Sequence, residues 1–107
     1  MSLAVAAEQA ISNTTQATIL TYVASAGDFL RGFTVFGKAE AEIEVQIDAS
    51  VKALGALVSG LSPAGGNSML IDRGIITPIA LSAGESVTVK ITREESADSR
   101  IFRAEVF

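Results

Sequence analysis

Apolar and polar residues alternate in three stretches of the chain, "AEIEVQID", "SVTVKITRE" and, from Phe102 onward, "RIFRAEVF". In the first, Ile43, Val45 and Ile47 occupy one side of an extended chain, while acids and amides occupy the other. A repeat of two residues is typical of a β-strand with one buried and one solvated face. The pattern therefore predicts three half-buried antiparallel strands.

Two further strands are predicted before these. The segment Ala17–Ala24 is rich in β-branched and aromatic residues, and "SAGD" follows as a turn in which Gly27 can adopt a positive φ. Phe29–Gly37 is the next apolar run, and a second reversal lies near Gly37 and Lys38. The short reversal predicts an antiparallel hairpin between this strand and the one that begins near residue 41.

The middle of the chain contains more glycine and proline. Val51–Ser62 favours a strand with a bulge or bend, because two glycines in a helix interior would each cost about 1 kcal/mol. "PAGGNS" (63–68) is the clearest loop. After it, two short apolar runs are predicted with a break at Asp72-Arg73-Gly74, and Pro78 favours an edge strand or a strand end.

Seven or eight short strands without a convincing helix predict an all-β protein, an antiparallel β-sandwich. A jelly roll is the favoured topology; an immunoglobulin-like sandwich is the alternative, although its Cys and Trp landmarks are missing. A chain of 107 residues fits one domain, which we assign to residues 17–107. Residues 1–16 form either an arm that docks on a neighbouring subunit or an edge strand of the same domain.

The net charge and the composition limit the classes of partner that the chain can bind. Lys and Arg total 8 against 12 Asp and Glu, a net charge of -4, so a nucleic acid backbone would be repelled. Neither a signal peptide nor an apolar stretch of the roughly 20 residues needed to cross a bilayer is recognisable. We expect a soluble protein made in the cytoplasm, with no nucleic acid and no membrane as a partner.

The residues available for catalysis are few. The chain has no His and no Cys, so acid–base chemistry would fall to carboxylates such as Glu42 and Glu44, roughly 6.5–7 Å apart along one strand face. A glycan-cleaving pair would also need a desolvated pocket and aromatic platforms, and the chain has 5 Phe, 1 Tyr and no Trp. We therefore expect the acids to line the solvated face of the sandwich, and we expect no enzyme, no cofactor and no metal site.

With catalysis not expected, we expect the function of the protein to lie in binding a partner. Arg31, Arg100 and Arg103 are placed to meet carboxylates, either of a partner or of neighbouring strands through Glu42, Glu44 or Glu105. The candidate partner-binding residues lie in the N-terminal segment, in the strand after the first turn and in the glycine-rich loop: Leu3, Val5, Arg31, Pro63, Gly65, Gly66 and Asn67.

A set of turns and strand ends resembles the small jelly-roll structural proteins of tailed bacteriophage virions. The resemblance covers Thr18 to Phe107 and is carried by Ala26-Gly27, Gly32 or Gly37, Ile47-Asp48, Ala83-Gly84-Glu85, Val87-Thr88-Val89-Lys90 and Phe102. The stretch Val51 to Pro78 departs from the pattern of that group.

The resemblance implies a non-enzymatic virion protein: a capsid cement or decoration subunit that binds the capsid shell as a homo-oligomer, a dimer or trimer. It would be made in the host cytoplasm and located in the virion. The alternative is a carbohydrate-binding module or a tail- or fibre-associated receptor-binding module, although Tyr22 is the only Tyr or Trp available to stack on a sugar.

Overall fold

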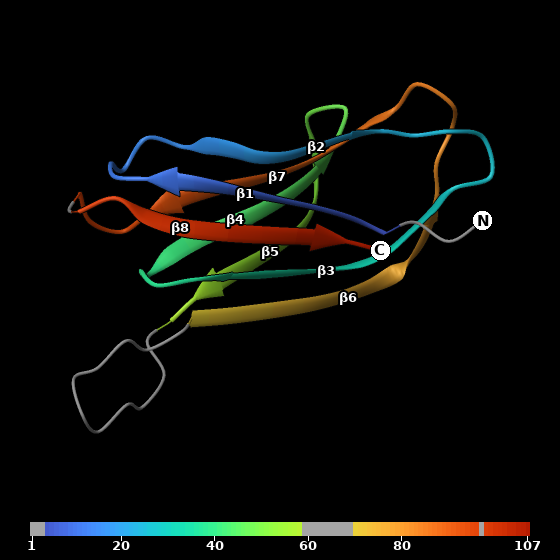
Figure 1. The fold of residues 1–107 in the computed structure, drawn as a ribbon. Helices are drawn as coiled ribbons and strands as arrows, with labels where there is room; N and C mark the ends of the chain where they lie inside the picture. The colour runs from blue at the N-terminus through green and yellow to red at the C-terminus, as the bar shows by residue number, and fades with distance from the viewer. Residues whose placement is uncertain (1–3, 59–69, 97) are drawn as a thin grey trace.

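The computed structural model describes residues 4–58, 70–96 and 98–107. Its eight strands form two four-stranded sheets that pack face to face (Figure 1). Sheet A has the order β1 (Val5–Ile11), β8 (Arg100–Val106), β3 (Phe29–Gly37), β6 (Leu70–Ala80). Sheet B has the order β2 (Ala17–Val23), β7 (Ser86–Arg93), β4 (Ala41–Ile47), β5 (Ser50–Leu57). All pairings are antiparallel, so the predicted β-sandwich is confirmed.

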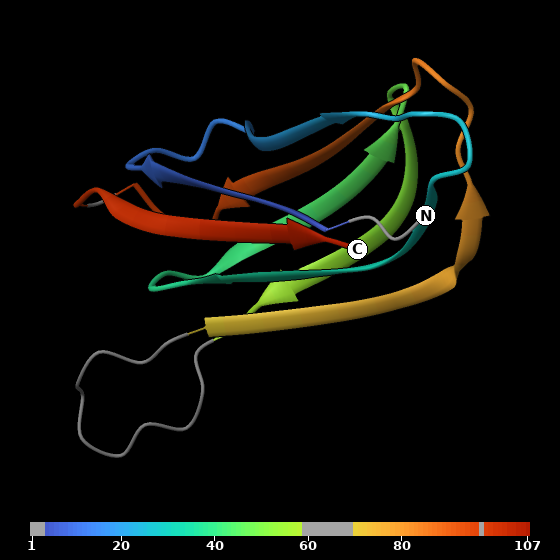
Figure 2. The same cartoon turned by 45° about the vertical axis from the view of Figure 1, so that its right-hand side comes forward.

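The strand pairs identify the topology as a jelly roll. β1 pairs with β8, β2 with β7, β3 with β6 and β4 with β5, as in one long hairpin folded at the β4–β5 turn. Winding this hairpin into two layers adds the pairs β3–β8 and β4–β7 (Figure 2). The described part of the chain has no helix long and apolar enough to cross a membrane.

The predicted hairpin between β3 and β4 is wrong. The two strands lie in different sheets, and residues 38–40 cross from one layer to the other. This crossing lets the inward residues Val35 and Ile43, both buried, belong to opposite walls of one core. β3 then pairs with β6 and β8, and β4 pairs with β5 and β7, so each strand has two hydrogen-bonding neighbours, which a β3–β4 hairpin alone would not provide.

β5 and β6, in the middle of the chain, agree with the sequence prediction in some features and differ in one. β5 carries the expected bulge: Val45 pairs with Ala53 and Gln46 with Val51, which leaves Lys52 as the extra residue. The predicted break at Asp72-Arg73-Gly74 is wrong, because β6 runs through these residues without interruption. β6 is an edge strand with Pro78 near its end, as expected.

The inward side chains of the two sheets form a single core. Its largest fully buried members are two rings and five aliphatic side chains: Phe33, Phe102, Leu20, Leu30, Ile43, Leu57 and Ile91. The Phe102 ring lies against the backbone of Gly37, and the Phe33 ring lies against the backbone of Gly74. Glycine at both positions leaves the space that the rings fill.

The β4–β5 turn is the local hairpin of the fold, and it has no glycine. Its central residues Asp48 and Ala49 both have positive φ, 47° and 67°, which is the backbone of a type I′ turn. The Asp48 carboxylate accepts a hydrogen bond from the Ser86 N–H at 2.9 Å, which attaches the turn to β7. Ala49 lacks such a contact and sits in a region that favours glycine.

Replacing Ala49 by glycine is expected to stabilise the protein by about 1 kcal/mol, because it removes the steric cost of the left-handed conformation and restores the favoured Asp-Gly turn. Urea unfolding followed by circular dichroism measures the gain. Ala53→Gly in the extended part of β5 is the control and should destabilise. Equal losses at both positions would contradict the prediction.

Candidate interaction surface

The outer face of sheet B is polar along its two central strands, β7 and β4, and has exposed aliphatic side chains on its edge strands, Val23 on β2 and Val51 and Leu54 on β5. Threonines and charged residues face outward from β2, β7 and β4: Thr18, Thr21, Thr88, Lys90, Thr92, Glu42 and Glu44. Glu44 lies opposite Lys90 in the β4–β7 register, and its carboxylate accepts a hydrogen bond from the Gln46 side chain at 2.8 Å. Glu42 and Glu44 thus lie on the outer face of the sandwich, where the alternation predicted them, whereas Asp48 lies in the β4–β5 turn.

The outer face of sheet A has a more continuous apolar surface, which crosses three adjacent strands. Ile71 and Ile75 on β6 and Ile101 on β8 are 59%, 78% and 62% exposed. The half-buried Phe36 pairs with Ile71 across β3 and β6, and the half-buried Phe107 ring packs beside Gly32, the partner of Ile75. These five side chains, Phe36, Ile71, Ile75, Ile101 and Phe107, form the surface that we call the sheet A patch.

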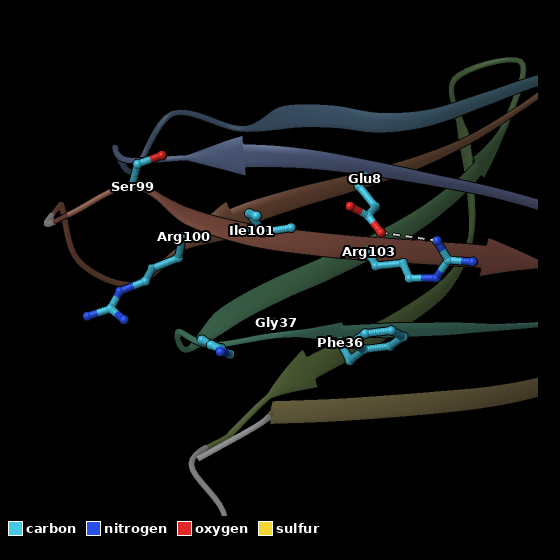
Figure 3. A pocket seen from close by; sticks show the side chains of 8 residues that line it. Glu8, Phe36, Gly37, Ser99, Arg100, Ile101 and Arg103 are labelled. Atoms are coloured by element: carbon cyan, nitrogen blue, oxygen red, sulfur yellow. Dashed lines mark hydrogen bonds and ion pairs between the residues drawn. The ribbon is translucent and has the colours of Figure 1, made fainter. Parts of the chain in front are cut away.

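A shallow depression of about 390 Å³ adjoins this patch (Figure 3). It is lined by Glu8, Phe36, Gly37, Lys38, Ser99, Arg100, Ile101 and Arg103. Phe36 and Ile101 provide its large apolar side chains, and three cations surround them. The depression combines apolar contact area with positive charge.

Both glutamates on the outer face of sheet A, Glu8 and Glu105, form ion pairs with the same arginine. Arg103 contacts Glu105 at 3.1 Å and Glu8 at 3.2 Å, and these carboxylates raise the pKa of the guanidinium. Figure 3 shows Arg103 turned towards Glu8 and Arg100 pointing away from both. Within the described residues, Lys38, Arg73 and Arg100 form no ion pair. The uncompensated charge on this face is therefore positive.

Two of the residues predicted to bind a partner can be placed. Val5 begins β1 opposite Val106, and its half-buried side chain packs against the core of its own domain. Arg31 is exposed at the irregular part of β3, with its guanidinium 5.5 Å from the centroid of the Phe29 ring. The other five lie outside the described residues: Leu3, Pro63, Gly65, Gly66 and Asn67.

β1 is the edge strand of sheet A within the same chain, which is one of the two forms considered for the N-terminal segment. Of the three arginines considered, Arg103 pairs with carboxylates of its own domain.

The buried Arg93 was not predicted from the sequence: its guanidinium donates to the carbonyls of Ile11 and Asp98 at 2.7 and 2.9 Å. Arg93 thereby joins β7 to the end of β1.

The sheet A patch was also missed. A signal for it was present, because Ile101 stands next to Phe102 and breaks the alternation of "RIFRAEVF". Since Phe102 points into the core, Ile101 has to point outward. An outward aliphatic residue indicates a contact surface when it belongs to a contiguous apolar patch, and the other members of this patch come from strands that only the fold brings beside Ile101.

Tyr22 is held by a buried carboxylate. Its hydroxyl donates to Asp28 at 2.5 Å, and the Ser25 N–H donates to the same oxygen at 2.9 Å. Both hydrogen bonds favour the ionised carboxylate, so the pKa of Asp28 lies below its usual value, while the carboxylate raises the pKa of Tyr22. Asp28 thus anchors the turn between β2 and β3.

We expect Asp28→Asn to lower the melting temperature at pH 7 and to lose this effect in acid. The native pKa of Asp28 is lower than the value of about 3.9 in an unfolded chain, so its stabilisation is present above that value. The stabilisation disappears as the pH falls through the native pKa. Melting curves of both proteins from neutral to acidic pH test this, and a difference that stays constant with pH would contradict it.

No three His, Cys, Asp or Glu side chains in residues 4–58, 70–96 and 98–107 are close enough together to hold a metal ion. No protein-family model matches the sequence, and no curated protein matches it. The function of the chain therefore has to be inferred from its fold and its surfaces.

Proposed function

We propose that this protein is a non-enzymatic structural subunit of a bacteriophage virion. In this proposal it is a capsid cement or decoration protein that binds the capsid shell through one face of the jelly roll. It acts as a dimer or trimer, because symmetric assembly repeats a modest interface many times.

The observation that carries the proposal is the difference between the two outer faces. The three isoleucines that sheet A exposes adjoin Phe36 and Phe107 across β8, β3 and β6. On sheet B the exposed Val23 and Leu54 lie on opposite edge strands, separated by the threonines and charges of β7 and β4. A subunit attached to a shell needs one face for the contact and another that stays in water. A single jelly roll with unlike faces meets this requirement without any further domain.

Light scattering after size-exclusion chromatography, with and without isolated capsid shells of the phage that encodes the chain, tests the proposal. We expect the mass of a dimer or trimer for the free protein and co-elution with the shells. Shells already saturated with unlabelled protein are the control and should take up little more. A monomer that elutes apart from the shells would contradict the proposal and favour the glycan-binding alternative, which a glycan array then tests.

A further inference from the structure

We propose that the sheet A patch and the neighbouring cations bind a protein surface on which carboxylates stand among aliphatic side chains. The inference rests on the proposed function in one respect, since it takes the shell protein as the partner. It adds the face that makes the contact and the chemistry of the surface that it meets.

The apolar part of the site spans three strands. Ile101 comes from β8, Phe36 from β3, and Ile71 and Ile75 from β6, so the patch crosses the sheet and is not confined to one edge. The isoleucines are exposed although the two sheets already bury a complete core beneath them. Contact with another aliphatic surface would remove these side chains from water, which is the main driving force of association.

The charged part of the site selects an acidic partner. Glu8 and Glu105 are both paired with Arg103, while Lys38, Arg73 and Arg100 have no carboxylate partner among the described residues. Arg73 instead lies 5.8 Å from the centroid of the Phe107 ring, beside the isoleucines of β6. In a chain of net charge -4, this face is locally positive. Carboxylates of a partner would complete its ion pairs and steer the encounter.

A second copy of the chain fits this face less well. A two-fold contact between two sheet A faces would bring the unpaired cations of both copies into one interface. Contact between sheet A of one copy and the acids of sheet B of the next would join opposite sides of the sandwich. Copies joined in this way form an open stack unless the rotation between them closes a ring, and a ring needs more than the two or three copies proposed above when the contacts lie on opposite faces. The surface is therefore better suited to a different protein.

Substitutions on the two faces test the inference. The sheet A variants are Ile101→Glu on β8 and Lys38→Glu, an exposed residue just after β3; the matched sheet B variants are Leu54→Glu and Lys90→Glu. We expect each sheet A variant to weaken binding to capsid shells at least about tenfold in a co-sedimentation titration, and the sheet B variants to stay within about twofold. Circular dichroism melting confirms that all four are folded.

A second measurement does not depend on the shells. Amide NMR of the full chain is recorded during titration with a soluble peptide in which Glu and Leu are separated by Ser, and with a peptide in which Lys replaces Glu. We expect shifts at outward residues of β3, β6 and β8 with the Glu peptide and weaker shifts with the Lys peptide. No shifts, or equal shifts with both peptides, would overturn the inference.

The two measurements separate the two proposals. Shell binding that all four variants retain would overturn the inference and leave the proposed function standing. If the wild-type protein ignores shells, the proposed function fails and the peptide titration alone decides the inference. A third outcome is that the mass from light scattering grows with protein concentration in the wild-type protein and stays constant in both Ile101→Glu and Lys90→Glu. This result would show that copies of the chain stack through sheet A and sheet B, and it would also overturn the inference.

Discussion

Replacing Phe102 by alanine is expected to lower the free energy of unfolding by about 3–5 kcal/mol. Phe102 is fully buried, and its ring fills the space over Gly37 on the neighbouring strand β3. Because Gly37 has no side chain to move into the vacated volume, much of the cavity would remain. A domain of this size is stable by only about 5–15 kcal/mol, so a large part of the population would unfold on mild heating.

Phe36→Ala is the matched control for this experiment. Phe36 lies on the same sheet but faces outward and is half-buried. Its removal takes less apolar area from the protein interior and leaves no enclosed cavity, so a clearly smaller loss is expected. Both variants are measured by urea unfolding with circular dichroism detection. Equal losses for Phe36 and Phe102 would show that the core is not organised around the Phe102 ring.

Gly74→Ala is expected to destabilise the protein by about 1–3 kcal/mol, although alanine is normally the better residue in a strand. A Cβ atom at Gly74 would lie closer than 3.0 Å to the ring of Phe33, which is itself buried. The ring is surrounded by the core and has little room to move, so the strand or the ring must shift.

A double-mutant cycle assigns the cause of this loss. Phe33→Leu replaces the ring with a smaller side chain and frees space above residue 74. If the contact with the ring is the cause, Gly74→Ala should cost less in the Phe33→Leu background than in the wild-type chain. Additive losses would mean that the cost of Gly74→Ala arises elsewhere. Thermal and urea unfolding of the four proteins provide the comparison.

Several features of the fold could be predicted from alternation alone. β4, β7 and β8 were expected where they occur, because a repeat of two residues shows which side chains point into a core. The bulged strand after residue 50 was also expected, since Gly55 argues against a helix. The same alternation placed Glu42 and Glu44 on the outside, where the structure shows them.

Pairing partners could not be predicted in this way. β3 and β4 are consecutive amphipathic strands with a short connection, yet they lie in different sheets. The hairpin that does form turns at Asp48 and Ala49, where no glycine signals it. Gly74 suggested a break in β6, but the strand continues because the ring of Phe33 occupies the place of a side chain.

The sequence by itself determined most of the strands, their buried faces and the sandwich, because these depend on the order of apolar and polar residues along the chain. Only the tertiary structure decided which strands are neighbours and which charges remain unpaired. Glu8 and Glu105 meet Arg103 while Lys38 and Arg73 meet no acid among the described residues, and this depends on β1, β3, β6 and β8 lying side by side. Such neighbours are set by burying one common core, which joins residues far apart in the sequence.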